Sequence, residues 1–206
     1  MISLSHIGEI LISKLLEEPK VISDLGSEIP FNPNNLIVVP EIRLDKSGDY
    51  IFDGVHKVDV SVLNTETMTC FPIEAKLGFD RLAKTSFETR FLEPCKTSHN
   101  NSRISGSMIS ILERKLPKCI SNEDLYITHN GQQYKLTKKW GLICRDKVIH
   151  NWKSNGYPEL SDNCSIISFE KLVTSYGGKD KFNELVKELI SFDYYDNWEC
   201  AHEKYS

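Results

Sequence analysis

The sequence predicts a single α/β domain in which a mixed β-sheet is flanked by helices. Apolar residues recur at helical spacing near the N-terminus, three segments rich in β-branched residues follow within residues 36–77, and a second helical pattern precedes another apolar strand. The resulting order is helix, three strands, helix, strand, which is typical of a sheet packed between helices. We treat residues 1–206 as one domain, with a core over about residues 5–170 and a C-terminal helical extension over about residues 171–206.

The first half of the chain supplies one helix and three strands. Isoleucine and leucine at helical spacing predict a helix over residues 5–17, and Pro19 is expected to end it. Residues 36–44 (LIVVPEIRL) follow the turn sequence Asn-Pro-Asn-Asn and predict a strand. Residues 55–63 alternate valine with polar residues, so the three valines are expected to share one face, and residues 69–77 form the third strand.

The second half is less regular. Residues 78–101 are polar and give no clear pattern, whereas apolar spacing over residues 102–116 predicts a helix that Pro117 closes. Two short apolar segments, 140–144 (WGLIC) and 165–169 (SIISF), predict further strands. An amphipathic pattern predicts a helix near residues 180–191.

Composition excludes several protein classes. Hydrophobic residues make up 40% of the chain and charged residues 26%, which are ordinary values for a folded protein and argue against disorder. The apolar runs are too short to span a bilayer, and the N-terminus lacks the basic region and the cleavage-like site of a secretory signal, so no such signal is expected. The six cysteines include no Cys-x-x-Cys pair, so reduced thiols in a cytoplasmic protein are expected.

The net charge of -4 conceals an uneven distribution. Residues 76–153 contain fifteen Lys and Arg against seven Asp and Glu, a net charge of +8, whereas both flanking segments are acidic. A basic middle segment can present a positive face to a polyanion although the total is negative. Chance clustering of charges on solvated surfaces explains the same pattern, so the distribution permits a nucleic-acid partner without requiring one.

The strands at residues 55–63 and 69–77 carry the residues that suggest chemistry. Residues two apart in a strand share a face, so Glu74 and Lys76 project together, and Asp59 lies on the polar face of the preceding strand. Two carboxylates and the Ala75 carbonyl are suitable ligands for Mg²⁺, which uses few protein carboxylates and keeps several waters. The alternative is a surface salt bridge of little energetic value.

Two other Glu-x-Lys triplets serve as internal comparisons. Glu18-Pro19-Lys20 lies at the end of the first predicted helix, and Glu113-Arg114-Lys115 lies within the later one. Neither follows an apolar strand that bears an aspartate. The Glu74-Ala75-Lys76 triplet is therefore the one that the sequence context favours as a functional site.

At Asp59 and Glu74-x-Lys76 the chain resembles the PD-(D/E)xK nuclease superfamily, which has the restriction-endonuclease-like fold. The order of elements over about residues 5–145 is also similar to that fold's three-layer α-β-β-β-α-β core. The resemblance implies a nuclease that requires Mg²⁺ or Mn²⁺, with Asp59, Glu74 and the Ala75 carbonyl as metal ligands. Lys76 would orient or activate the attacking water. Glu41 on the first strand and Glu9 on the first helix match carboxylates that some members add to the metal shell.

Basic residues of the middle segment are candidate contacts to nucleic acid. Arg103 is expected at the start of a helix, where free backbone N–H groups favour anions. Lys84, Arg90 and Lys96 lie in the polar stretch after the third strand. Individually each of the four is better explained as a solvated cation, whereas together they fit contact with a phosphate backbone.

The sequence thus predicts a metal-dependent nuclease that acts on DNA rather than RNA, in restriction, phage defence or DNA repair. It would act as a homodimer or as a subunit of a larger complex, without membrane contact. Two alternatives stay open. One is a non-cleaving subunit of the same fold that binds nucleic acid or a protein, and the other is a small interaction protein whose strand charges are surface ion pairs.

Overall fold

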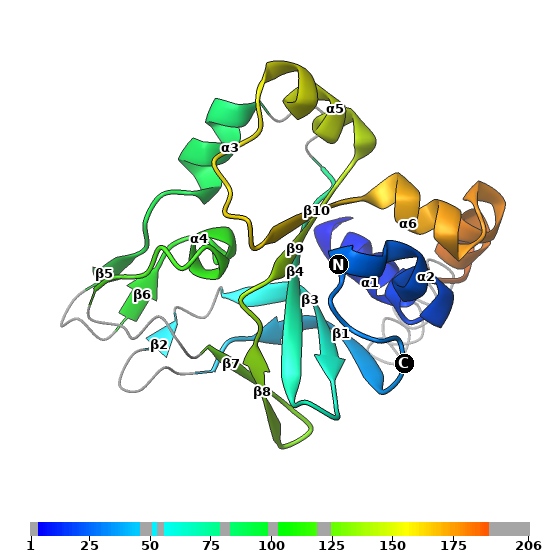
Figure 1. Ribbon diagram of the computed structural model, residues 1–206, viewed down its shortest axis with the longest axis horizontal. Helices are drawn as coiled ribbons and strands as arrows, with labels where there is room; N and C mark the ends of the chain where they lie inside the picture. Colours follow the sequence, from blue (N-terminus) through cyan, green and yellow to red (C-terminus); the bar gives the residue numbers. More distant parts are fainter. Residues whose placement is uncertain are drawn as a thin grey trace, which may run out of the picture.

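The computed structural model describes residues 4–45, 51–52, 56–78, 83–98, 103–118 and 125–189. Its main feature is a mixed sheet of seven strands, beside which lies a smaller sheet of three short strands (Figure 1). The larger sheet contains β1 (Leu36–Arg43), β3 (Lys57–Asn64), β4 (Thr69–Lys76), β7 (Tyr126–His129), β8 (Gln132–Leu136), β9 (Trp140–Cys144) and β10 (Cys164–Ser168). The smaller sheet contains β2 (Ile51–Phe52), β5 (Lys96–Ser98) and β6 (Arg103–Ser105).

The larger sheet branches at β4. One edge of β4 pairs antiparallel with β3, and β3 pairs antiparallel with β1. On the other edge, Thr69 and Cys70 pair with β8, whereas the four residues from Ile73 to Lys76 pair in parallel with β9. The carboxyl end of β4, which carries Glu74 and Lys76, therefore lies in the middle of the sheet.

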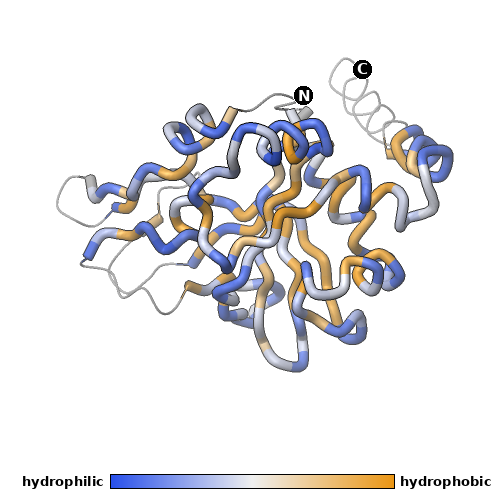
Figure 2. The backbone as a smooth tube through the Cα atoms, turned by 45° about the horizontal axis from the view of Figure 1, so that its top comes forward, coloured by the Kyte–Doolittle hydropathy of each residue, from blue (hydrophilic) through white to orange (hydrophobic). Residues whose placement is uncertain are grey.

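Helices cover both faces of this sheet. On one face, α1 (Leu4–Leu16), α2 (Pro19–Leu25), α6 (Phe169–Tyr176) and the helical residues 179–189 pack on valine, phenylalanine and isoleucine of β3 and β4, with the short 3₁₀ helix Gly26–Glu28 beside them. On the other face, α3 (Lys84–Phe91), α4 (Met108–Leu112) and α5 (Asp146–Asn155) enclose a second core around Phe87, Trp140 and Trp152. The hydropathy colouring shows apolar strands between helices of mixed polarity (Figure 2). The α/β class with a mixed central sheet flanked by helices is confirmed.

Most predicted strands are confirmed to within two residues, but the valine face is not. Val60 and Val62 pack in the core beneath α1 and α2, whereas Val58 joins the core beneath α3 and α4. Opposite this point Glu41 of β1 has a φ of 49°, and the β1–β3 ladder omits it between the pairs at Pro40 and Ile42. Such a local irregularity increases strand twist, so residues on its two sides face different layers.

The helix predicted over residues 102–116 is confirmed only for Met108–Leu112, so its predicted start and its predicted end are both wrong. Arg103–Ser105 form strand β6, and helix α4 begins only at Met108. Ser107 caps this helix by accepting a hydrogen bond from Ser110 N at 3.0 Å. A Cβ on Gly106 would lie 2.6 Å from Cys95 Sγ, so this turn requires glycine. Apolar spacing alone did not reveal the break.

Several elements were not predicted from the sequence. Pro19 does not merely end the first helix, because it begins α2 at a position where proline is favoured. Helices α3, α5 and α6 and the β7–β8 hairpin were also missed. The predicted helix near residues 180–191 is confirmed through residue 189, and the remainder of the predicted C-terminal extension lies outside the described residues.

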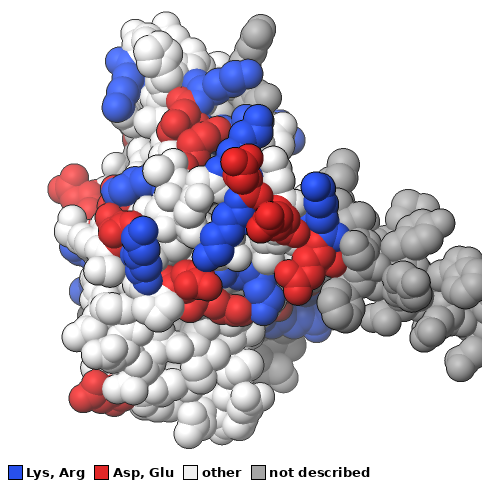
Figure 3. All heavy atoms as spheres, turned by 90° about the vertical axis from the view of Figure 1, so that its right-hand side faces the viewer, with Lys and Arg blue, Asp and Glu red and all other residues white. Residues whose placement is uncertain are grey.

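One face of the molecule carries a mixture of positive and negative side chains. On the face that Figure 3 shows, basic and acidic side chains interleave, so this side of the molecule has no uniform positive field among the residues drawn in colour.

In the described part of the chain, no helix combines the length and apolar character needed to cross a membrane. The cysteines at positions 70, 95, 144 and 164 are free thiols.

Candidate active site

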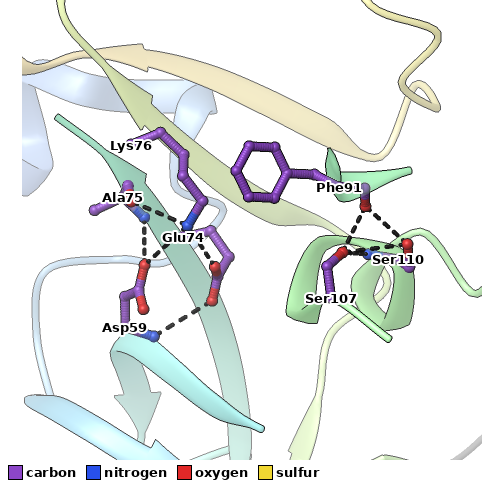
Figure 4. Close-up of polar contacts among 7 residues, drawn as sticks. All are labelled: Asp59, Glu74, Ala75, Lys76, Phe91, Ser107 and Ser110. Carbon is purple, nitrogen blue, oxygen red and sulfur yellow. Dashed lines mark hydrogen bonds and ion pairs between the residues drawn. The ribbon is translucent and has the colours of Figure 1, made fainter. Parts of the chain in front are cut away.

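Asp59 and Glu74 face each other where the β3–β4 ladder ends. The last backbone pair of the ladder is Val60 with Ile73. Beyond this pair, the side chain of Asp59 forms a hydrogen bond across the two strands. Its Oδ2 accepts a hydrogen bond from Ala75 N at 2.8 Å, while Asp59 N donates to Glu74 Oε1 at 3.5 Å (Figure 4). The Asp59 carboxylate is thus fixed by the Ala75 amide, and the Glu74 carboxylate by the Asp59 amide.

Lys76 lies between these carboxylates. Its Nζ is 3.0 Å from Glu74 Oε2, 3.5 Å from Asp59 Oδ2 and 3.1 Å from the Ala75 carbonyl oxygen (Figure 4). The ammonium therefore contacts the same three groups that the resemblance implies as metal ligands. The ring of Phe91, at the end of α3, lies on its other side with the ring centroid 5.4 Å from Nζ.

Burial and neighbouring charges shift the pKa values of this cluster in opposite directions. Glu74 is buried, and desolvation raises its pKa to about 7 although the neighbouring Lys76 ammonium lowers it. Burial lowers the pKa of Lys76, but the charges of Glu74 and Asp59 raise it by more, so the net shift is upward from 10.5. The lysine is therefore a cation at neutral pH, and Glu74 is close to its titration point.

Two further carboxylates lie beside the pair. Burial raises the pKa of Glu9 on α1 to about 8, and the charge of Asp59, a hydrogen bond with Glu41 and the charges of Glu41 and Glu74 add to the shift. Glu41 on β1 is also 3.1 Å from Lys57 Nζ. Its left-handed backbone costs of the order of 1 kcal/mol, and strain of this kind is concentrated at functional sites. The structure thus brings all four predicted acidic residues into one electrostatic cluster.

The donor set fits a hard divalent cation in charge and chemistry. Lys76 contacts Asp59 and Glu74, Lys57 contacts Glu41, and protons on Glu9 or Glu74 relieve part of the remaining negative charge. Among the described residues, however, no three His, Cys, Asp or Glu side chains form a group that could hold a metal. The fit is therefore limited to Asp59, Glu74 and the Ala75 carbonyl, a small set of the kind that Mg²⁺ uses together with waters.

The predicted nucleic-acid contacts do not all lie together. Arg90 and Lys96 line one pocket between α3 and the smaller sheet. Lys84 lies at the opposite end of α3, where its Nζ is 3.8 Å from Glu88 Oε1. Arg103 lies on strand β6, so the predicted helix start at this residue is wrong.

Phe91 is a site residue that the sequence did not reveal. It lies in the polar stretch 78–101, which had no assigned structure, and it follows helical residues of low apolar content. Its side chain contacts Lys76 although fifteen positions separate the two residues. No local pattern marks such a long-range contact.

Comparisons with known proteins do not identify the chain. No protein-family model matches it, and neither a curated protein nor a solved structure is significantly similar. Its function must therefore be argued from the arrangement of its own residues.

Proposed function

We propose that this protein is a metal-dependent nuclease of the PD-(D/E)xK type that hydrolyses phosphodiester bonds of DNA. The observation that carries the proposal is the convergence of Asp59, Glu74 and Lys76 at the central end of β4. A restriction-endonuclease-like fold is part of the proposal, and the mixed sheet between two helical layers is compatible with it.

The proposed chemistry divides between the residues in a simple way. Asp59, Glu74 and the Ala75 carbonyl would hold Mg²⁺ or Mn²⁺, which lowers the pKa of a bound water and neutralises phosphate charge. The amide of Ala75 fixes the Asp59 carboxylate through a 2.8 Å hydrogen bond, so one ligand is oriented in advance. Lys76, a cation in a largely buried position, orients the attacking water and stabilises the negative charge that develops on the phosphate.

Glu9 and Glu41 are proposed as supporting carboxylates. Glu9 is hydrogen-bonded to Glu41, and the charges of Asp59 and Glu74 add to the upward shift of its pKa, so Glu9 lies within electrostatic reach of both. A cation bound at the site would stabilise the ionised form of Glu9 and release its proton.

A second candidate function is favoured by the position of Lys76. Its ammonium contacts both carboxylates and the carbonyl, so it offsets one of the two negative charges without any metal, and a proton on Glu74 offsets the other. A non-cleaving subunit that binds nucleic acid or a protein partner requires only this neutral arrangement. We rank it second because a purely structural ion pair does not require the additional carboxylates Glu9 and Glu41.

The experiment is to incubate the purified protein with labelled DNA and RNA in Mg²⁺, Mn²⁺ or EDTA. DNA cleavage in either metal that stops in EDTA supports the nuclease. RNA cleavage alone would overturn the substrate assignment. Metal-independent binding of DNA without cleavage in any condition would favour the non-cleaving subunit. Restriction, phage defence or repair in the cytoplasm, and a homodimer or larger complex, are the settings that we propose for this activity.

A further inference from the structure

A pocket of about 400 Å³ lies on the α3 side of the candidate active site. Its volume falls within the range of about 300–1,000 Å³ that is usual for small-ligand sites. Its lining comes from the end of α3, from β5 and β6 and from the start of α4: Arg90, Phe91, Glu93, Pro94, Lys96, Ser105, Gly106, Ser107 and Ser110. The two cations, Arg90 and Lys96, outnumber the single carboxylate of Glu93, so the charge of the lining favours an anion.

Hydrogen bonds fix the wall of this pocket. The hydroxyls of Ser107 and Ser110 both lie within hydrogen-bonding distance of the Phe91 carbonyl oxygen, at 2.5 and 2.7 Å (Figure 4). Buried His56, which precedes β3, contacts the Gly106 carbonyl oxygen through Nε2 at 2.8 Å. The pocket wall is therefore tied both to α3 and to the strand that carries Asp59.

The pocket and the candidate active site share one aromatic ring. The Phe91 ring centroid is 5.4 Å from Lys76 Nζ and 5.6 Å from the Arg90 guanidinium carbon. The two cations consequently lie within about 11 Å of each other, which is the sum of these distances. Each nucleotide of one strand advances about 3.4 Å along the axis of a duplex, so this upper limit corresponds to at most about three nucleotides.

We propose that this pocket holds a backbone phosphate of the nucleic-acid strand, within about three nucleotides of the bond that is cut. Lys96 is exposed and has no ion-pair partner among the described residues, so it is available to a phosphate. Arg90 lies against the Phe91 ring and supplies a second cationic donor, whereas the Ser107 and Ser110 hydroxyls already donate to backbone carbonyl oxygens and serve only to fix the wall. The position relative to the cut rests on the proposed nuclease function, whereas the phosphate contact does not.

Binding without cleavage tests the contact. Fluorescence anisotropy of a labelled oligonucleotide in EDTA compares the wild-type protein with Lys96→Glu and Arg90→Gln. The control is Lys20→Glu, which changes an exposed lysine on α2 in the opposite layer. We expect Lys96→Glu to weaken binding about tenfold and the control to change it less than about twofold. A neutral variant, Lys96→Met, should reduce the slope of log K against log salt by about one.

A competition experiment distinguishes a nucleic-acid strand from a free phosphate or nucleotide as the ligand of the pocket. Inorganic phosphate and a 5′-mononucleotide are added to the same assay, and neither should displace the oligonucleotide at equal concentration. Displacement by the mononucleotide from the wild-type protein but not from Lys96→Glu would assign the pocket to a free nucleotide and overturn the strand assignment. Equal affinity of Lys96→Glu and Lys20→Glu, or no binding by the wild-type protein, would also overturn it. A Lys96-dependent contact in a protein that cuts nothing in either Mg²⁺ or Mn²⁺ would support the pocket and reject the nuclease.

Discussion

The ammonium of Lys76 lies 3.0 Å from Glu74 Oε2, and the same nitrogen also contacts Asp59 and the Ala75 carbonyl. Lys76 thus already contacts the three oxygen atoms that a divalent cation would need as ligands. A metal bound to these atoms would compete with the ammonium, and Lys76 would then shift towards Phe91 or towards solvent. This competition leads to the first prediction.

Lys76→Met should bind Mn²⁺ more tightly than the wild-type protein. Removal of the ammonium frees the three oxygen atoms, and the apparent Kd should fall about tenfold. Thermal unfolding with increasing Mn²⁺ measures this, because a bound metal raises the Tm. Glu74→Gln is the matched control and should show little Mn²⁺-dependent change in Tm. Equal shifts in all three proteins would mean that the metal binds elsewhere.

Lys76→Met should also destabilise the metal-free protein. It leaves Glu74 buried beside Asp59 without its counter-ion, and we expect a loss of about 1–3 kcal/mol in the free energy of unfolding near pH 8. The loss should be smaller near pH 5, since a protonated Glu74 no longer requires an ammonium. Urea unfolding in EDTA measures both values. A loss that is the same at both pH values would contradict this explanation.

The stability of the wild-type protein should fall as pH rises. The pKa of Glu9 is raised to about 8 and that of Glu74 to about 7, whereas the unfolded chain releases these protons near the ordinary value of 4.5. Between about pH 5 and pH 8 the folded protein binds more protons than the unfolded chain, so higher pH favours unfolding. Above about pH 8 both states are ionised and the dependence levels off.

Glu9→Gln isolates one contribution to this pH dependence. It should flatten the fall in the free energy of unfolding between about pH 5 and pH 8, measured by urea unfolding in EDTA. The exposed residue Glu66, in the turn between β3 and β4, supplies the control Glu66→Gln, which should keep the wild-type slope. An unchanged slope in Glu9→Gln would show that Glu9 does not carry a raised pKa.

Phe91→Leu should reduce catalysis more than stability. The ring holds the Lys76 ammonium from one side, and loss of a cation–π contact of about 0.5–2 kcal/mol predicts a rate lower by roughly two- to thirtyfold. Leucine keeps most of the apolar volume, so the Tm should fall by only a few degrees. Cleavage rates and thermal unfolding are compared with Phe169→Leu, which removes a ring from the other core. An equal loss of rate in both variants would remove Phe91 from the site.

The sequence indicates the central strands and the Asp59, Glu74 and Lys76 cluster because these depend on local alternation. Residues two apart in a strand share a face wherever the strand lies in the sheet, so the convergence of Glu74 and Lys76 is a local property. The hairpin β7–β8 was predictable too. Its Asn130-Gly131 turn, with φ values of 49° and 76°, is a strong sequence signal for a hairpin.

Other features depend on contacts that no local pattern contains. The apolar residues of 102–116 have helical spacing, yet Gly106 must turn because its backbone packs against Cys95. Glu41 adopts a left-handed backbone although glutamate does not favour it. The position of Phe91 against Lys76 joins α3 to β4 across the core, so only the folded structure reveals it.

The central claim is that Glu74 and Lys76 act as a catalytic pair and not as a surface ion pair. Its most direct test is the rate of DNA cleavage in Mg²⁺ for Glu74→Gln and Lys76→Met, beside Glu18→Gln and Lys20→Met from the exposed Glu-x-Lys triplet at the start of α2. We predict that the first two variants lose cleavage by at least about a hundredfold and that the second two retain the wild-type rate. Wild-type cleavage by Glu74→Gln or Lys76→Met would contradict the claim.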